Sequence, residues 1–194
     1  MREPESAEAG RSSDDRAAFD AFFSHHYREL SRFAYLLTGE HAAADDITAE
    51  ALAEAWRHWN RVAAADLPLA YVRRIVANLA ADRTTTLVRE RRSWRLWAIG
   101  RKDRIEAPDI TAAADLREAL LRLPARKRAC VVLRYYYGLS ERETASTLGI
   151  AVGTVKSQSS RGLEELAALL HGTRDTATGT RGHKQRSTTE GATP

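Results

Sequence analysis

The sequence has few of the residues that build disulfide scaffolds, cysteine-rich metal sites and membrane spans. It contains one cysteine in 194 residues, Cys130, and a single thiol forms neither an internal disulfide nor a multi-cysteine zinc site. Its longest apolar stretches, such as 75–81, are far shorter than the roughly 20 residues that cross a bilayer. The first ten residues, MREPESAEAG, have no apolar core. We therefore expect neither a signal peptide nor membrane insertion.

Patterns typical of enzymes are also missing. We find no glycine-rich phosphate loop, no metal-ligand cluster and no nucleophile–base pair, and the six histidines are scattered apart from the neighbours His25 and His26. Cys130 stands in the apolar run ACVVL, which favours a buried core residue over a redox sensor. We therefore expect no enzymatic activity, no cofactor, no metal and no small-molecule substrate.

Charge is low overall but unevenly distributed along the chain. The net charge is +4, yet residues 40–54 carry five acidic residues and no lysine or arginine. Residues 83–104 carry eight basic residues against two acidic ones, and residues 122–134 carry five basic residues and no acidic one. Each run alone is typical of a solvated helix face. Together they indicate two partners of opposite charge, or pairing between the segments.

Apolar residues recur at helical spacing along most of the chain, and no segment alternates as a strand does. This pattern predicts an all-α protein made of two small helical domains joined by a linker. We place the first domain at 16–93, the linker at 94–110 and the second domain at 111–171. The polar ends, 1–15 and 172–194, are predicted to be disordered.

Three helices are expected in the first domain. They run from about Asp15 to Gly39, over 43–59, and from Pro68 into the arginine-rich segment, with 60–67 as a loop. In the second of these helices, the apolar side chains at helical spacing are predicted to face inward. They are Ile47, Ala51, Ala55, Trp56 and Trp59.

Residues 138–166, GLSERETASTLGIAVGTVKSQSSRGLEEL, have the spacing of a helix-turn-helix. Ser140 is predicted to cap a short helix over 141–148, with Glu143 completing a capping box and Gly149 taking the left-handed turn. The next helix presents a polar, basic face, which favours DNA binding over a plain helical hairpin. Its candidate DNA contacts are Thr154, Lys156, Ser157, Gln158, Ser160 and Arg161.

Two parts of the chain resemble one known family. The segment RLPARKRACVVLRYYYGLSERETASTLGIAVGTVKSQSSRGLEEL resembles the C-terminal region of extracytoplasmic-function (ECF) sigma factors of bacterial RNA polymerase. Residues 43–59, AADDITAEALAEAWRHW, resemble the polymerase-binding helix of that family, and residues 68–83, PLAYVRRIVANLAADR, resemble its promoter-melting helix. The resemblance covers about 19–170, and the alanine- and arginine-rich composition is similar to that of actinobacterial members.

The resemblance implies a cytoplasmic RNA polymerase sigma factor with three kinds of partner. These are core polymerase (the clamp helices of its largest subunit, and its flap), promoter DNA and an anti-sigma factor. The implied polymerase-binding residues are Asp45, Asp46, Glu50, Leu52 and Trp56. The implied minus-ten contacts, next to a loop that captures a flipped base, are Arg61, Tyr71, Arg74, Asn78 and Arg83. At the minus-thirty-five element, the recognition helix is joined by phosphate contacts from Arg126, Lys127 and Arg128.

Some residues depart from the family pattern, and one rival function stays open. Thr144 and Ser159 stand where the family usually has apolar residues, which predicts looser packing, and Gln158 replaces a common arginine. The rival is a two-domain transcription regulator that binds DNA without polymerase, and the acidic helix over 43–59 argues against it. Off polymerase, the two domains either clamp around an anti-sigma factor or pack on each other.

Overall fold

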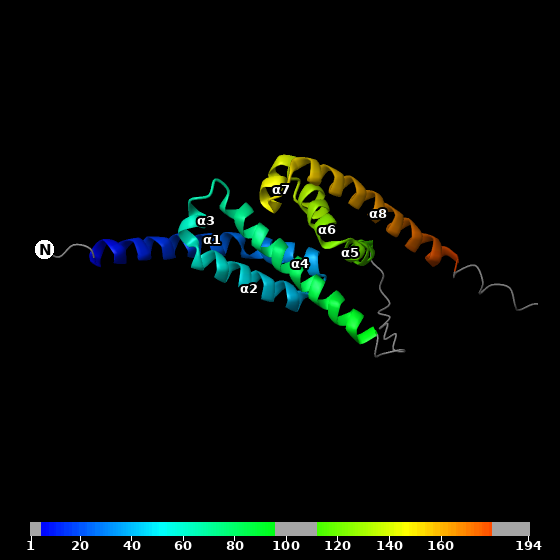
Figure 1. Cartoon of the computed structure of the whole chain (residues 1–194), viewed down its shortest axis with the longest axis horizontal. Helices are drawn as coiled ribbons and strands as arrows, with labels where there is room; N and C mark the ends of the chain where they lie inside the picture. The colour runs from blue at the N-terminus through cyan, green and yellow to red at the C-terminus, as the bar shows by residue number, and fades with distance from the viewer. Residues whose placement is uncertain (1–4, 96–111, 180–194) are drawn as a thin grey trace, which may run out of the picture.

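The computed structural model of the protein describes the backbone of residues 5–95 and 112–179, and side chains within 13–83 and 115–171. Every element in these ranges is helical, which confirms the predicted all-α fold class (Figure 1). The first bundle consists of α1 (Glu5–Thr38), α2 (His41–Arg57), α3 (Trp59–Ala63) and α4 (Pro68–Arg95). The second consists of α5 (Ala112–Arg122), α6 (Ala125–Val131), the π-helical turn η1 (Val132–Tyr136), α7 (Glu141–Leu148) and α8 (Val152–Gly179).

The first bundle packs α1, α2 and α4 around an apolar core. Each helix carries apolar side chains at three- and four-residue spacing, so each presents one apolar stripe to its neighbours. Phe33 of α1 and Val72 and Val76 of α4 are completely buried in this core. Of the five residues predicted to face inward over 43–59, four are buried, one of them (Trp59) in α3, but Trp56 is 43% exposed. The prediction for Trp56 as a core residue is therefore wrong.

The helix-turn-helix forms as the local pattern predicts. The backbone N–H of Glu143 donates to Oγ of Ser140 (3.2 Å), and the backbone N–H of Ser140 donates to Oε2 of Glu143 (2.7 Å). Hydrogen bonds to the carboxylate from the side chain and the backbone N–H of Ser140 favour its ionised form and lower the pKa of Glu143. Gly149 ends α7 at φ +64°, a conformation that side-chain-bearing residues rarely adopt. The predicted bounds of this helix, the capping box and the turn are confirmed.

Both ends of the described chain are more helical than predicted. Helix α1 begins at Glu5 and α8 continues to Gly179, so the described backbone is helical over 5–15 and 172–179, where the sequence predicts disorder. Once a packed core holds one part of a helix, each further residue adds a backbone hydrogen bond without repeating the cost of nucleation. Residues 1–4 and 180–194 lie outside the described ranges.

Two connections also differ from their prediction. Residues 59–63 form the short helix α3 where a loop was expected over 60–67, because the buried side chains of Trp59 and Val62 anchor that turn to the core. The true connection is thus shorter, at 64–67. Of the predicted linker, residues 94 and 95 continue α4, and the rest lies outside the described ranges.

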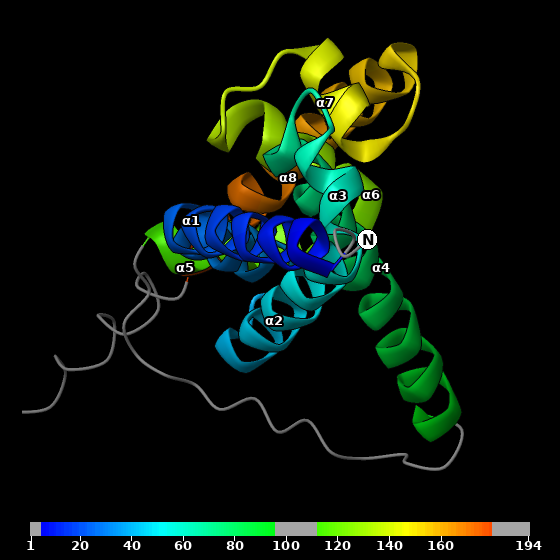
Figure 2. The same cartoon turned by 90° about the vertical axis from the view of Figure 1, so that its left-hand side faces the viewer.

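The two bundles pack on each other rather than standing apart (Figure 2). Helix α1 contacts α5 and α6, and α4 contacts α6 and α7. A single apolar cluster runs from Phe33 in the first bundle to Leu133 and Leu166 in the second. Gly39, just after α1, lies so close to the Leu121 side chain of α5 that any larger residue there would overlap it. Of the two off-polymerase arrangements considered above, the structure has the one in which the domains pack together.

Cys130 is a core residue, as its apolar surroundings in the sequence predict. It is completely buried in α6, and burial raises the pKa of its thiol to about 11. Over the described residues, no group of three or more His, Cys, Asp and Glu side chains is placed to hold a metal ion. Within the same ranges, none of the helices combines the length and the apolar character that a membrane span needs.

Candidate protein and nucleic-acid interfaces

The outward face of α2 is acidic. Asp45, Asp46 and Glu50 are exposed on it, and the small residues Ala49 and Ala53 are exposed among them. Alanines allow a partner helix to approach closely, and the surrounding carboxylates attract a basic partner. The face therefore suits a basic helical protein surface, and it is open to solvent in this structure. We call these five residues the acidic face.

Trp56 and Leu52 take opposite positions relative to the acidic face. The exposed ring of Trp56 packs against Phe19 of α1 with 5.0 Å between ring centroids, which gives the face an aromatic edge. Leu52 is only 3% exposed because its side chain points into the core of the bundle. The prediction that Leu52 touches polymerase directly is therefore corrected, because the Leu52 side chain packs inside the bundle and anchors α2 to its core.

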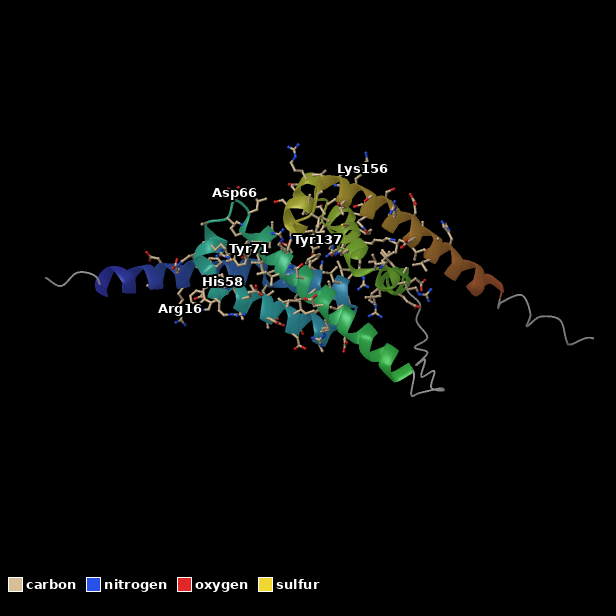
Figure 3. All side chains as sticks on the ribbon, viewed as in Figure 1. Arg16, His58, Asp66, Tyr71, Tyr137 and Lys156 are labelled. Atoms are coloured by element: carbon tan, nitrogen blue, oxygen red, sulfur yellow. The ribbon has the colours of Figure 1, made fainter. Side chains whose placement is uncertain are left out.

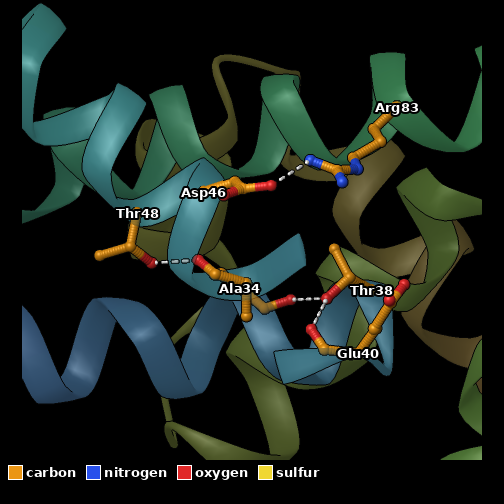
Figure 4. Close-up of polar contacts among 7 residues, drawn as sticks. Ala34, Thr38, Glu40, Asp46, Thr48 and Arg83 are labelled. Carbon is orange, nitrogen blue, oxygen red and sulfur yellow. Dashed lines mark hydrogen bonds and ion pairs between the residues drawn. The ribbon is translucent and has the colours of Figure 1, made fainter. Parts of the chain in front are cut away.

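Arg83, predicted to contact minus-ten DNA, lies beside the acidic face instead. Its Nη1 is 3.3 Å from Oδ2 of Asp46, and this ion pair joins α4 to α2 (Figure 4). Both side chains are largely exposed, so the pair contributes at most about 1 kcal/mol and opens easily. Arg83 is thus separated from the other predicted minus-ten residues on α4.

Three of the predicted minus-ten residues form a stripe along α4. Tyr71, Arg74 and Asn78 are spaced by three and four residues, which places them on one side of the helix. Arg74 and Asn78 are exposed and Tyr71 is half-buried. The fourth, Arg61, is exposed on α3. Figure 3 shows Tyr71 and Asp66 of the 64–67 connection at the same end of the first bundle. We call Tyr71, Arg74 and Asn78 the α4 stripe.

The α4 stripe faces the second bundle. The guanidinium group of Arg74 lies against Gly149 in the turn of the helix-turn-helix, where even a methyl group would overlap it. Asn78 and Arg126 line the same crevice of about 460 Å³ between α4, α6 and α7. Residues predicted to bind different promoter elements are thus brought together, while Arg74, Asn78 and Arg126 all stay exposed.

The recognition helix presents its polar residues to solvent. Thr154, Lys156, Ser157, Ser160 and Arg161 are exposed, and Gln158 is half-buried. The opposite side of α8, which includes Val155, is buried against α7 and α6. Oγ of Ser160 donates to Oε1 of Glu164 (3.1 Å). Because an acidic residue repels phosphates, Glu164 limits the part of α8 that suits DNA to its first turns.

The three basic residues at the start of α6 lie in three different environments. Arg126 is exposed, whereas Lys127 forms an ion pair with Glu165 of α8. Arg128 is 4% exposed, and burial lowers the pKa of its guanidinium. It donates hydrogen bonds to the backbone oxygens of Leu37, Leu121 and Leu123. The prediction that Arg128 binds DNA phosphate is therefore corrected, because the side chain is buried and both of its terminal nitrogens, Nη1 and Nη2, donate to carbonyl groups inside the protein.

The core of the helix-turn-helix contains two buried hydroxyl groups without a hydrogen-bond partner. They are Oγ1 of Thr144 and Oγ of Ser159, on side chains that are 0% and 4% exposed. A buried, unsatisfied hydroxyl costs roughly 1–3 kcal/mol. These are the two positions where the sequence predicts looser packing.

Replacing Thr144 with valine should stabilise the protein by about 1 kcal/mol, because the change removes an unsatisfied hydroxyl and keeps the branched shape. The measurement is the free energy of unfolding from chemical denaturation. The matched control is Thr48→Val in α2, where Oγ1 donates to the backbone oxygen of Ala44 (2.7 Å). That variant should gain nothing, and equal stabilisation by both changes would contradict the explanation.

Sequence reasoning missed the residues that join the two bundles, chiefly Arg117 and Tyr137. Helical spacing shows that one side of each helix is apolar, but it does not show which distant helix that side meets. Arg117 donates to Oη of Tyr35 (3.1 Å), and the hydroxyl of Tyr137 donates to the backbone oxygen of Glu29 (3.1 Å). Neither pair has a local sequence signal.

Family comparisons match both halves of the chain. The family described as Sigma-70 region 2 matches residues 22–92, and that described as Sigma-70, region 4 matches residues 113–166. The chain is 34% identical over 166 residues to the ECF RNA polymerase sigma factor SigM of Mycobacterium tuberculosis, covering 84% of this chain and 82% of SigM. It is 33% identical over 161 residues to SigL of the same species, covering 77% of this chain and 87% of SigL.

Solved structures show the same architecture. The sigma factor RpoE of Bartonella quintana, crystallised with the anti-sigma factor NepR, aligns with a TM-score of 0.63 and 26% identity. That alignment covers 79% of this chain and 97% of RpoE. CnrH, solved in complex with the cytosolic domain of CnrY, aligns with a TM-score of 0.60 and 26% identity, covering 84% of this chain and 94% of CnrH.

Proposed function

The chain belongs to the family of ECF RNA polymerase sigma factors, and we propose how its two domains share the recognition of a promoter. It binds core polymerase and directs promoter-specific initiation of transcription. In our proposal the first bundle, the region 2 domain, binds the polymerase clamp helices and the minus-ten element. The second bundle, the region 4 domain, meets the flap and the minus-thirty-five element.

The observation that carries this division is the separation of two chemically different surfaces. The acidic face of α2 suits a basic protein surface and repels DNA, whereas the first turns of α8 present Lys156 and Arg161 beside small hydroxyl side chains. A regulator that acts without polymerase would not need a surface that attracts a basic protein and repels DNA. Both surfaces occur in one chain whose halves match the two sigma regions.

The proposed minus-ten contacts are the α4 stripe and Arg61. Arg74 would hold phosphates of the non-template strand, Asn78 would hydrogen-bond a base edge, and Tyr71 offers an aromatic surface for stacking. Opening the duplex costs a few kcal/mol for each unstacked base, which these contacts offset. Arg83 joins them when its exposed ion pair with Asp46 opens.

At the minus-thirty-five element, we propose that α8 enters the major groove by its first turns. Lys156 and Arg161 supply the positive charge, while Thr154, Ser157, Gln158 and Ser160 offer hydrogen bonds to phosphates or base edges. Arg126 and, once released from Glu165, Lys127 would hold phosphates beside the groove. The phosphate contacts would position the region 4 domain on the DNA, and the base contacts would recognise the promoter sequence.

We also propose an anti-sigma factor as a protein partner, because the sigma factor RpoE described above was crystallised with the anti-sigma factor NepR, and CnrH was solved in complex with the cytosolic domain of CnrY. An apolar groove of about 610 Å³ lies between α1, α5, η1 and α8, and Leu116, Tyr135 and Leu163 are exposed in it. Such a groove fits the apolar face of an amphipathic helix. Because residues of both bundles line it, a helix bound there would favour the packed arrangement.

Sigma factors are transcription initiation factors, and we propose no catalytic step for this chain itself. Polymerase catalyses RNA synthesis, while this chain selects the promoter at which synthesis begins. Because RNA polymerase and the chromosome are its working partners, we place its action in the cytoplasm.

The test of the proposed function is transcription in vitro with purified core polymerase, followed by mapping of start sites. Adding the protein should produce transcripts from a limited set of start sites that share upstream motifs at the minus-ten and minus-thirty-five positions. A polymerase-independent regulator would bind DNA without core polymerase and would create no new start sites. That result would favour the rival function.

A further inference from the structure

The exposed side of the recognition helix has small residues along its middle and a positive charge on either side. Residues spaced by three and four follow one line along a helix, and four exposed residues of α8 share such a line. They are Gly153, Ser157, Ser160 and Glu164. Lys156 and Arg161 lie on opposite sides of this middle line (Figure 3 labels Lys156). The space beside Gly153 is open, so the helix backbone can approach the floor of a groove.

The hydroxyl group of Ser160 has a fixed direction. A serine hydroxyl has one hydrogen to donate and two lone pairs that accept, whereas a carboxylate only accepts. The hydrogen between Oγ of Ser160 and Oε1 of Glu164 (3.1 Å) therefore comes from Ser160. Because that hydrogen is used inside the protein, Ser160 presents only lone pairs to a ligand.

Ser157 is in the same state for a different reason. Its Oγ donates to the backbone oxygen of Thr154 (3.0 Å), and a carbonyl oxygen also only accepts. Ser157 therefore presents only lone pairs as well. Lys156 and Arg161 have the opposite character, because ammonium and guanidinium groups only donate. The middle line of α8 thus offers acceptors, and the two sides offer donors.

The major groove distinguishes bases by the same property. Adenine and cytosine present an amino group that donates, at N6 and N4, whereas guanine and thymine present a carbonyl oxygen, at O6 and O4. An acceptor-only serine pairs with an amino group. Opposite a carbonyl oxygen it would place acceptor against acceptor and leave both groups unpaired.

We propose that Ser157 and Ser160 select bases that carry an amino group, adenine or cytosine, in the minus-thirty-five element. Glu164 is the positioning residue that fixes the direction of the Ser160 hydroxyl. This inference rests on the proposed entry of α8 into the major groove, and it names the chemical class of base that the middle line reads.

The experiment measures binding of polymerase holoenzyme to duplexes that carry a mapped minus-thirty-five element, with one amino group removed at a time. Purine replaces each adenine, and the pyrimidinone that lacks the amino group replaces each cytosine. With the wild type, loss of the amino group that faces Ser160 should weaken binding about 5-fold. With Ser160→Ala the same loss should have no effect, and this comparison cancels any change in duplex stability. Ser157→Ala should abolish the effect at a different base.

Two changes at Glu164 test the direction of the hydroxyl. Replacing the base that faces Ser160 with guanine or thymine should weaken binding of the wild type about 20-fold. In Glu164→Ala the freed hydroxyl can turn and donate, so the same replacement should weaken binding only about 3-fold. Glu164→Gln keeps an acceptor oxygen and should keep the wild-type preference. Equal loss of preference in both variants would assign the effect to the charge of Glu164 and overturn the proposal.

Glu165→Ala is the matched control for charge. It removes one negative charge from the next residue of the same helix, but Glu165 pairs with Lys127 of α6. The variant should bind every duplex somewhat more tightly and should keep the wild-type preference among bases. A preference that changes as it does in Glu164→Ala would contradict the proposed role of Glu164.

Lys156→Ala with Arg161→Ala separates this inference from the proposed function. If that double change weakens promoter binding while no amino group depends on Ser157 or Ser160, the selection of bases by the serines is wrong and the docking of α8 stands. If the double change and both serine changes leave promoter binding unaltered, α8 does not enter the groove. The minus-thirty-five assignment then fails, and the inference fails with it.

Discussion

Changing Asp45 and Asp46 together to lysine should weaken binding of core RNA polymerase about 100-fold, equivalent to about 2.7 kcal/mol. Both carboxylates are exposed on α2. Reversal of their charge removes two attractions to a basic partner and adds two repulsions at a surface that complex formation partly dehydrates. The loss is much larger than that expected from a single exposed ion pair.

The fold should tolerate this double change. Asp45 accepts only an exposed hydrogen bond from Ser31 (3.3 Å), and Asp46 has its exposed ion pair with Arg83. The measurement is the dissociation constant with core polymerase, supported by circular dichroism of the free variant. The control, Asp14→Lys with Asp20→Lys, changes the net charge equally at exposed positions of α1. If both double variants lose the same affinity, net charge rather than the acidic face determines binding.

Replacing Lys156 and Arg161 together with alanine should weaken the binding of holoenzyme to a duplex carrying the minus-thirty-five element about 100-fold. Both side chains are exposed on the first turns of α8, where we propose that DNA binds. A specific base contact contributes about 1–3 kcal/mol, and a phosphate contact adds a salt-dependent attraction. The slope of log affinity against log salt concentration should therefore become shallower by about one for each phosphate that the variant no longer neutralises.

The salt titration makes this second prediction specific. Arg28→Ala with Arg122→Ala removes two exposed positive charges outside the recognition helix and serves as the control. Its affinity and salt slope should stay close to those of the wild type. Binding of core polymerase should be unchanged in Lys156→Ala with Arg161→Ala, because the acidic face is intact. Wild-type promoter affinity in that variant would show that α8 does not enter the major groove.

The helix-turn-helix shows which features could be predicted from the sequence. The capping box of Ser140 and Glu143, the left-handed Gly149 and the bounds of α7 all depend on groups within a few residues of one another. Such short-range hydrogen bonding has a recognisable residue pattern, so the prediction was confirmed. The outward position of Lys156 and Arg161 follows in the same way from the period of the helix.

Leu52 and Arg128 show why the rest could not be predicted. Each stands close to exposed, charged residues, and family resemblance assigned both to an interface. Leu52 is buried in the core of its own bundle. Arg128 donates to Leu37, 91 positions earlier in the chain, and this partner exists only when the bundles are packed. A run of three basic residues does not reveal which of them meets buried carbonyl groups.

The sequence alone therefore determines most of the helices, the turn between α7 and α8, and the separation of acidic and basic residues along the chain. These features depend on interactions between residues that are near one another in the chain, so they can be inferred before any tertiary contact is known. Only the tertiary structure decides that the two domains pack together and that Arg74 and Asn78 face the second bundle. The contact of Tyr137 with Glu29 joins residues 108 positions apart, and a pairing over that distance depends on how whole helices pack.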